Sequence, residues 1–222
     1  RTLFNGQYTR TASYFSNSDL ASSGLPEGEE LELLEQYRSR VPERVFTDEF
    51  QPPVTDGSGR PRENLRTAAA LLEAAGWEIR DLKLVNVETA EPMVFEILLY
   101  SPAFERIVLP FTRNLEQLGI EASIRLVDQT QYINRFREKD FDMLVWTWGE
   151  SETPGNEQRG YWGTDAADAT GSRNLAGIKD PVVDELIELL VMSESREQLN
   201  VRTRALDRVL LWGFFVIPQW HI

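Results

Sequence analysis

The sequence predicts an α/β protein in which helices flank a mixed, mostly parallel sheet. Between residues 95 and 148, three apolar or alternating segments typical of strands are separated by two segments with helical spacing. Each connection is long enough to hold a helix, which favours parallel neighbours joined by right-handed crossovers. With 222 residues and no cysteine, the chain can bury a sizeable core and does so without disulfides.

The first part of the chain, residues 1–60, is expected to be largely a loop and helix extension. Its predicted elements are the end of a helix (1–8), a loop rich in Ser, Asn and Gly (9–26), a helix (27–40) and a second loop (46–60). The helix at 27–40 begins with acidic side chains at Glu27, Glu29 and Glu30. We expect these carboxylates to be solvated at the positive end of the helix dipole.

The remainder, residues 61–222, is expected to form the α/β core. A helix is predicted from Asn64, as its cap, to Ala75, with Gly76 ending it in a left-handed conformation. Residues 82–87 and 93–100 are expected to pair as a hairpin around the turn at residues 89–92.

The alternating units follow from Phe95 onward. They are predicted as a strand (95–100), a helix (102–118) closed by Gly119, a strand (120–127), a helix to about 137 with Asp128 or Thr130 as its cap, and a strand (141–148). Pro110 is expected to kink or split the first of these helices. Two more helices (181–192 and 195–212) and a closing strand (214–217) are predicted after the long loop, with caps from Asp180-Pro181 and from Ser195 with Glu197 or Gln198.

The stretch FDMLVWTWGESETPGNEQRGYWGTDAADATGSR, residues 141–173, organises the functional interpretation. It begins as a buried strand and continues as a long polar loop with tryptophans beside it. In an open α/β sheet, ligands sit in loops beyond the carboxyl ends of strands. Long loops on buried strands are more often functional than structural. We therefore place the candidate site here.

Composition excludes several classes of function. A formal charge of −13 argues against a nucleic-acid partner, which needs a basic footprint. No run approaches the roughly 20 apolar residues of a membrane helix. His221 is the one histidine, so a His-based triad and a multi-histidine metal site are excluded within this chain, and no phosphate-binding glycine loop occurs. We expect no catalytic residue, no metal and no cofactor.

Acidic pairs give the alternative hypothesis. Asp140 and Asp142 are interpreted as the solvated edge of a strand. Glu150 and Glu152, in the loop, suit general acid–base work and suggest a hydrolase acting on peptide or glycan. No partner nucleophile, water-activating metal or histidine supports that alternative, so a non-enzymatic binding role is favoured.

A binding pocket needs aromatic walls and a few polar groups, and the loop offers both. For Trp146, in mid-strand, burial in the core is favoured over ligand contact, whereas Trp148, at the strand exit, suits a cleft wall equally well. Gly149, Glu150, Ser151 and Glu152 follow directly, and either glutamate could pair with a ligand amine.

Arg173 and Asn174 end the loop. Arg173 could clamp a carboxylate or phosphate, and Asn174 could bind a ligand amide. Each has the alternative of bonding to the protein's own backbone, which is favoured for Asn174 and evenly balanced for Arg173. Tyr161-Trp162 is expected to pin the loop to the body of the protein, and Asn156, Gln158 and Arg159 to order the loop itself.

These residues resemble a known family. ENLRTAAALLEAAGWE, the strand and helix pattern from FEILLY to FDMLVWTWG, GIKDPVVDELIE and VIPQW resemble the extracellular solute-binding proteins of the peptide/oligopeptide class, the binding subunits of ABC importers. RTLFNGQYTRTASYFSNSDLASSGLP, PGNEQRGYWG and the ending VLLWGFFVIPQWHI resemble the YejA-like subgroup, whose members import oligopeptides and peptide conjugates. The resemblance covers nearly the whole chain.

The resemblance implies a type II periplasmic-binding-protein-like lobe, with residues 1–222 as the carboxyl-terminal lobe of a two-lobed protein. The absence of an initiator Met and the abrupt end at Ile222 are interpreted as those of a fragment. The implied protein is a periplasmic monomer that traps an oligopeptide or peptide conjugate by hinge closure and delivers it to an inner-membrane permease.

The chain departs from the family pattern at one position. Many oligopeptide binders carry W-x-x-D here, and the Asp pairs with the peptide's amino terminus. Trp148 matches the Trp, but Ser151 stands at the Asp position. A neutral hydroxyl cannot anchor an ammonium as a carboxylate does. The resemblance therefore implies that Glu150 or Glu152 takes this role, or that the amino end is blocked or held otherwise.

Overall fold

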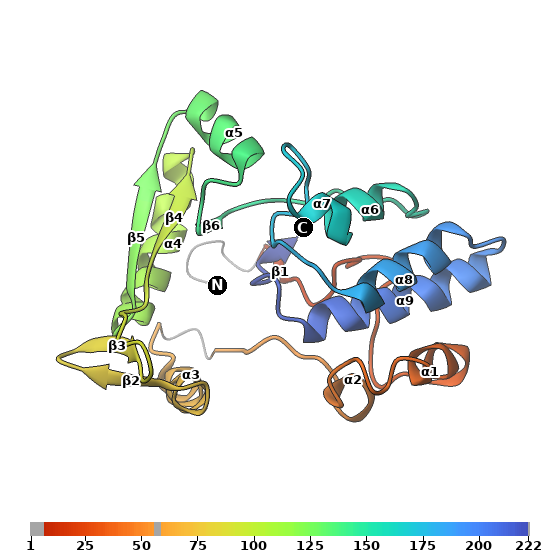
Figure 1. Cartoon of the computed structure of the whole chain (residues 1–222), viewed down its shortest axis with the longest axis horizontal. Helices are drawn as coiled ribbons and strands as arrows, with labels where there is room; N and C mark the ends of the chain where they lie inside the picture. The colour runs from red at the N-terminus through yellow and green to blue at the C-terminus, as the bar shows by residue number, and fades with distance from the viewer. Residues whose placement is uncertain (1–6, 56–58, 222) are drawn as a thin grey trace. The chain divides into compact units, whose positions relative to one another are not determined.

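The structure is a computed structural model that describes residues 7–55 and 59–221. The chain divides into two compact units (Figure 1). Unit 1 holds residues 53–147, and unit 2 holds residues 7–52 together with 148–221. The described part of unit 1 is one continuous segment, whereas unit 2 combines two segments that are far apart in the sequence.

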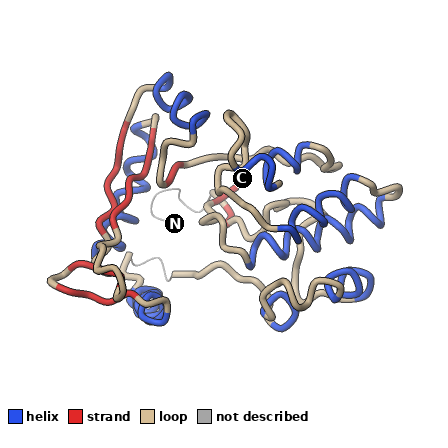
Figure 2. Tube along the Cα trace, in the orientation of Figure 1, coloured by secondary structure: helices blue, strands red, loops and turns tan. Residues whose placement is uncertain are grey.

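Unit 1 is built on a parallel sheet with the order β5-β4-β6. Its strands are β4 (Val94–Leu99), β5 (Glu121–Leu126) and β6 (Met143–Leu144), joined through α4 (Pro102–Glu116) and α5 (Gln129–Glu138) (Figures 1 and 2). The predicted parallel arrangement between residues 95 and 144 is thus confirmed. A cluster of Ile97, Leu99 and Val108 fixes α4 against the sheet.

The strand predicted over 141–148 is much shorter in the structure. Only Met143 and Leu144 pair, both with β4. The carbonyl of Val145 accepts a hydrogen bond of 2.6 Å from the Tyr132 hydroxyl of α5 instead of a strand neighbour. Because β6 lies at the edge of the sheet, a side chain can take over its backbone bonding and release the chain from the sheet.

A hairpin forms in this region, but its two strands are not the predicted pair. β3 (Lys83–Asn86) pairs antiparallel with β2 (Trp77–Arg80), which was not predicted, while β4 joins the parallel sheet. Asp81 and Leu82, both at positive φ, form the tight turn between β2 and β3. Near the expected turn, Val85 and Pro92 form an isolated bridge, and the Met93 amide donates to the Leu84 carbonyl at 2.8 Å. The strand predicted over residues 93–100 is confirmed as β4, but its predicted pairing with residues 82–87 as a hairpin is wrong.

The helices of unit 1 begin and end close to the predicted positions. α3 (Arg62–Ala74) starts before Asn64, whose side chain donates to the Val54 carbonyl, so Asn64 is not its cap. α4 is not split at Pro110. Gly119 follows α4 at φ +77°, and a Cβ there would lie 2.7 Å from the Leu84 backbone nitrogen. Only glycine meets both conditions.

Unit 2 is mainly helical and holds the larger core. Its helices are α1 (Gly28–Glu35), α2 (Arg44–Thr47), α6 (Glu157–Trp162), α7 (Thr164–Ala167), α8 (Pro181–Val191) and α9 (Arg196–Trp212). α8 and α9 pack together, and their buried Val, Leu and Ile side chains form one cluster with Trp162. The predicted caps are confirmed: Asp180 accepts from the Val182 amide and Ser195 from the Gln198 amide.

The last predicted strand is wrong. Residues 214–217 form no strand, and Phe214 has a φ of +52° with 64% of its surface exposed. The strand pairing occurs later, where β7 (Trp220–His221) lies antiparallel to β1 (Thr9–Arg10). Residues 1–6 of the helix end predicted at 1–8 lie outside the described residues. Residues 7 and 8 are not helical.

Two adjacent charged residues of α9 anchor the amino-terminal part of unit 2. Asp207, fully buried, accepts from the backbone amides of Tyr14 and Ser22. Arg208, 1% exposed, pairs with Glu30 at 2.8 Å and donates to the carbonyl of Gly24. The expectation that Glu30 is solvated is therefore wrong, since a cation 178 residues along the chain buries it.

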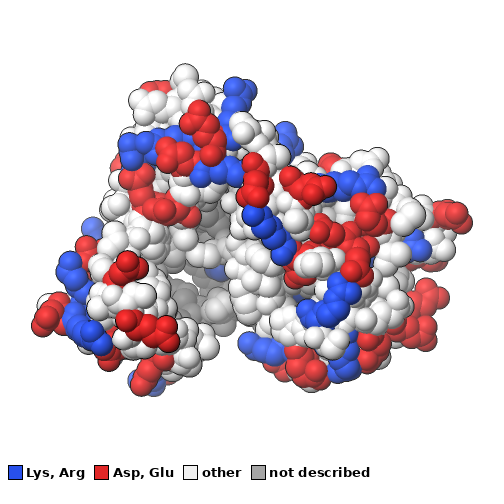
Figure 3. Space-filling model, in the orientation of Figure 1, with Lys and Arg blue, Asp and Glu red and all other residues white. Residues whose placement is uncertain are grey.

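Charged side chains cover the visible faces of both units. Figure 3 shows acidic and basic residues interspersed there, in keeping with the formal charge of −13. Among the described residues, no helix has the length and apolar character needed to cross a membrane.

Candidate functional site

The loop after Trp148 in unit 2 is held by contacts along its whole length. The Trp148 ring lies 5.0 Å from the Trp162 ring, centroid to centroid, and its Nε1 donates to the Arg173 carbonyl at 3.0 Å. Trp148 is half-buried at the edge of the main apolar cluster. The two ends of the loop are thereby joined through one indole ring.

A buried polar chain supports the next turn of the loop. The Trp162 Nε1 donates to Gln158 Oε1 at 2.8 Å, and Gln158 Nε2 donates to Glu150 Oε2 at 2.6 Å. The Tyr161 hydroxyl donates to the Gly149 carbonyl at 3.3 Å. Tyr161 and Trp162 are both buried, which confirms the predicted pin, and Gln158 orders the loop as expected.

Glu150 is a carboxyl in a poor environment for charge. Its Oε1 is buried and has no hydrogen-bond partner. Burial raises the pKa of Glu150 to about 7; the Gln158 hydrogen bond opposes this rise, and the nearby negative charges of Glu157 and Asp207 add to it. A substantial fraction of Glu150 is therefore protonated at neutral pH.

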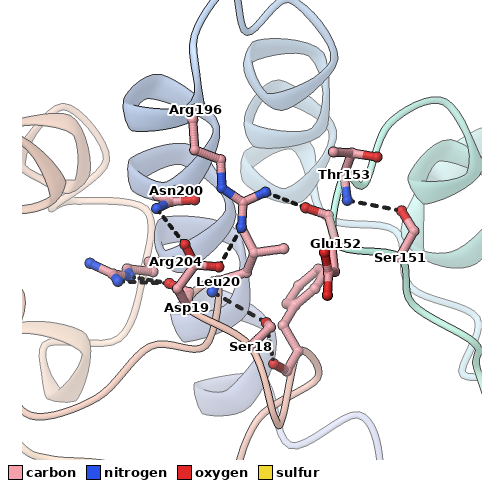
Figure 4. Close-up of polar contacts among 10 residues, drawn as sticks. Ser18, Asp19, Leu20, Ser151, Glu152, Thr153, Arg196, Asn200 and Arg204 are labelled. Atoms are coloured by element: carbon pink, nitrogen blue, oxygen red, sulfur yellow. Dashed lines mark hydrogen bonds and ion pairs between the residues drawn. The ribbon is translucent and has the colours of Figure 1, made fainter.

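Arg196, at the start of α9, fixes the backbone of the loop at Glu152. Its guanidinium donates to the Glu152 carbonyl and also pairs with Asp19 (Figure 4). Asp19 is held further by Asn200 at 3.0 Å and by Arg204, which bonds its carbonyl at 2.7 Å. The loop backbone and the Asp19 turn are thus tied to the same helix.

Ser151 and Glu152 are both exposed. The Ser151 hydroxyl accepts from the Thr153 amide at 3.2 Å, a local turn contact. The arrangement leaves the Glu152 carboxylate in solvent, while its backbone is fixed by Arg196.

Arg173 and Asn174 have different surroundings. Arg173 is exposed, and its guanidinium contacts the Tyr161 hydroxyl at 3.2 Å and lies 5.8 Å from that ring's centroid. Asn174 is fully buried and bridges the backbone of Gly163 and Ile178 with bonds of 2.9 Å. The backbone-bonding alternative for Asn174 is what the fold uses.

Trp146 belongs to unit 1. Its ring stacks on Phe136 of α5, with centroids 4.4 Å apart and planes 9° from parallel, and its Nε1 is buried without a partner. It lines a pocket with residues of β4, described below. The predicted site residues therefore fall in two units, with only Trp146 in the sheet unit.

The described residues offer few of the groups that an enzyme site would need. Among the residues that the structure describes, the Glu150 carboxyl bonds to Gln158 and to no hydroxyl that it could activate as a nucleophile. The one histidine, His221, contacts the Thr11 hydroxyl. Among the described residues, no group of three or more His, Asp or Glu side chains is placed to hold a metal ion.

Some residues that hold the backbone of unit 2 in place could not be identified from the sequence. Arg196 and Asp207 lie 44 and 57 positions beyond Glu152 and Glu150, and no local motif links them to the loop. Helical spacing placed both on α9, but their partners depend on which segment packs against that helix. The full burial of Gln158 is likewise a tertiary property.

A family model described as bacterial extracellular solute-binding proteins, family 5 Middle, matches residues 1–170 of the chain. A probable peptide-binding protein YejA from Agrobacterium fabrum is 47% identical over 221 residues, which is all of this chain and 36% of that protein. The chain spans about a third of the length of the curated relatives it matches.

Two solved structures are similar in fold. An oligopeptide ABC transporter periplasmic binding protein from Thermotoga maritima, with bound mannohexaose, gives a TM-score of 0.69 at 16% identity over 99% of this chain and 38% of that one. The oligopeptide-binding protein AppA from Bacillus subtilis, in complex with a nonapeptide, gives a TM-score of 0.64 at 16% identity. The match covers 87% of this chain and 39% of that one. The predicted fold class, a type II periplasmic-binding-protein-like lobe, is confirmed.

Proposed function

Because the chain belongs to the bacterial extracellular solute-binding proteins of family 5, we propose that it is the carboxyl-terminal lobe of the binding subunit of an ABC importer. The proposed ligand is an oligopeptide or peptide conjugate. The main support for this ligand class is the 47% identity of the whole chain to a probable peptide-binding protein. The remaining two thirds of such a relative would supply the second lobe.

The proposed protein works in the periplasm as a monomer and delivers its ligand to an inner-membrane permease. Its ligand is trapped by hinge closure between the two lobes, as in other two-lobed binding proteins. The loop from Trp148 to Glu152, with Arg173, forms this lobe's part of the binding surface. Its fixed backbone supports such a role, since a held loop loses less entropy on binding.

Glu152 is the best candidate to receive the ligand's amino group in place of the missing Asp. The Glu152 side chain is exposed, and Arg196 holds its backbone. Glu150 is a poorer anchor, because its carboxyl is largely buried and already bonded to Gln158. Ser151, at the position of the usual Asp, carries no charge to offer an ammonium.

Calorimetry with the protein that carries this chain tests the proposal. Peptides of three to nine residues are expected to bind, and Trp148→Ala to weaken them by at most a few kcal/mol, the range of a buried aromatic contact. Trp77→Ala, which removes a half-buried indole from the β2–β3 hairpin, is the matched control. Normal affinity in Trp148→Ala would remove Trp148 from the site. Binding of mannohexaose with no binding of peptides would overturn the proposed ligand class.

A further inference from the structure

Unit 1 contains a pocket of about 240 Å³ where β4 and β6 end. This edge of a parallel sheet is where α/β folds bind ligands. The residues that line it share an uncharged character: Leu98, Leu99, Tyr100, Ser101, Phe104, Tyr132, Val145, Trp146 and Thr147. All of them are described, and all belong to unit 1.

The aromatic walls are held in place by contacts outside the pocket. The stack on Phe136 fixes the plane of Trp146. The Tyr132 hydroxyl donates to the Val145 carbonyl at 2.6 Å, and its ring lies 4.8 Å from that of Tyr100, at 57°. A ligand group entering the pocket therefore finds its walls already oriented, which lowers the entropy cost of binding.

Size and polarity select the group that fits. A cavity of roughly 150 Å³ with apolar walls accepts a benzene molecule. The pocket is somewhat larger, which suits one aromatic side chain with part of its backbone and not an extended peptide. An ionised side chain would lose its hydration there without gaining a charged partner.

Two features are left available to a ligand. Tyr100 is 48% exposed, although its ring is a wall of the pocket. Ser101, the N-cap residue of α4, makes no side-chain capping bond to the helix. An aromatic surface beside a hydroxyl suits the side chain and the neighbouring peptide group of one residue.

We propose that this pocket receives an aromatic side chain of the bound peptide, stacked on Tyr100, with the adjacent ligand backbone bonded to Ser101. The inference rests on the proposed function and adds to it a preference for peptides that carry an aromatic residue. The residues that line the pocket belong to unit 1, and those of the Trp148 loop belong to unit 2.

Saturation-transfer NMR on the protein that carries this chain tests the pocket by itself. N-acetyl-phenylalanine amide is expected to bind, and N-acetyl-alanine amide and N-acetyl-aspartate amide to bind at least tenfold more weakly. Tyr100→Ala should weaken the phenylalanine probe by roughly tenfold, since it removes one aromatic contact. Tyr100→Phe should retain binding, because it keeps the ring.

Leu126→Ala is the matched control, since Leu126 ends β5 at the same edge with 42% exposure and does not line the pocket. Equal probe affinity in Tyr100→Ala and Leu126→Ala, or no preference for phenylalanine over alanine, would overturn the proposal.

A peptide series separates failure of the pocket from failure of the proposed function. Ala-Ala-Ala and the three peptides with one Phe substitution are titrated against the same variants. Peptides that bind without a gain from Phe at any position, and without a loss in Tyr100→Ala, contradict the pocket and leave the proposed function intact. Binding of the phenylalanine probe at Tyr100 with no binding of any peptide contradicts the proposed function alone.

Discussion

The Trp148 loop of unit 2 and the Tyr100 pocket of unit 1 use similar side chains in opposite ways. In the loop, the indole of Trp148 packs on Trp162 and donates to the Arg173 carbonyl, so partners within the protein orient it before a ligand binds. In the pocket, Tyr100 is half-exposed and Ser101 leaves its helix uncapped. The difference teaches that an aromatic residue beside a strand end is informative about ligands only once its own contacts are known.

Replacement of the buried arginine of α9, Arg208, should have the largest effect. Arg208→Ala leaves the Glu30 carboxylate buried without its cation, and we expect a loss of about 3–5 kcal/mol in the free energy of unfolding. Urea denaturation measures it. Arg204→Ala, on the same helix but only partly buried, should cost about 1 kcal/mol. Equal losses would contradict the view that buried polar anchors fix unit 2.

The pH dependence of stability sharpens the role of Glu150. Its pKa is raised by burial from about 4.5 to about 7, so the folded state holds the proton more tightly than the unfolded state. Its contribution to stability is fully present below pH 4.5 and is lost as pH rises towards 7. Burial also raises the pKa of Asp207, which adds to the same trend.

Glu150→Gln should therefore reduce the fall of the unfolding free energy between pH 5 and 7 by about 2 kcal/mol, while the part due to Asp207 remains. Chemical denaturation across this range measures the slope. Glu152→Gln, an exposed change two residues away, should leave the slope as it is. A wild-type slope in Glu150→Gln would show that Glu150 is ionised in the fold.

Asn174 tests whether the loop ends serve structure or ligand. Asn174→Ala removes three bonds to the backbone of Gly163 and Ile178, and we expect a loss of about 2 kcal/mol of stability. Peptide affinity, measured by calorimetry on the folded variant, should not change. Unchanged stability with weakened peptide binding would give Asn174 the ligand role that its burial argues against. Asn156→Ala, at an exposed position, is the control.

Sequence patterns predicted the elements whose causes are local. Asp128 caps α5, Asp180 caps α8 and Ser195 caps α9, because each side chain bonds an amide two or three residues away. The parallel direction of the strands in the sheet also followed from the spacing of strands and helices.

Pairing choices made at a distance could not be predicted. The Tyr132 hydroxyl shortens β6, and the positive φ angles of Asp81 and Leu82 select β2 as the partner of β3. Glu30 was predicted to be solvated, but it pairs with Arg208, 178 residues further along the chain. In the candidate site, the residue types were found from the sequence, but which of them are already bonded within the protein depends on tertiary packing.

The central claim, a lobe that binds peptides, is tested most directly by identifying the natural ligand. The protein that carries this chain would be purified from the periplasm without denaturation, and the small molecules released on unfolding analysed by mass spectrometry. We predict peptides or peptide conjugates, with an aromatic residue enriched among them. Recovery of glycans or other solutes alone, with no peptide, would contradict the account.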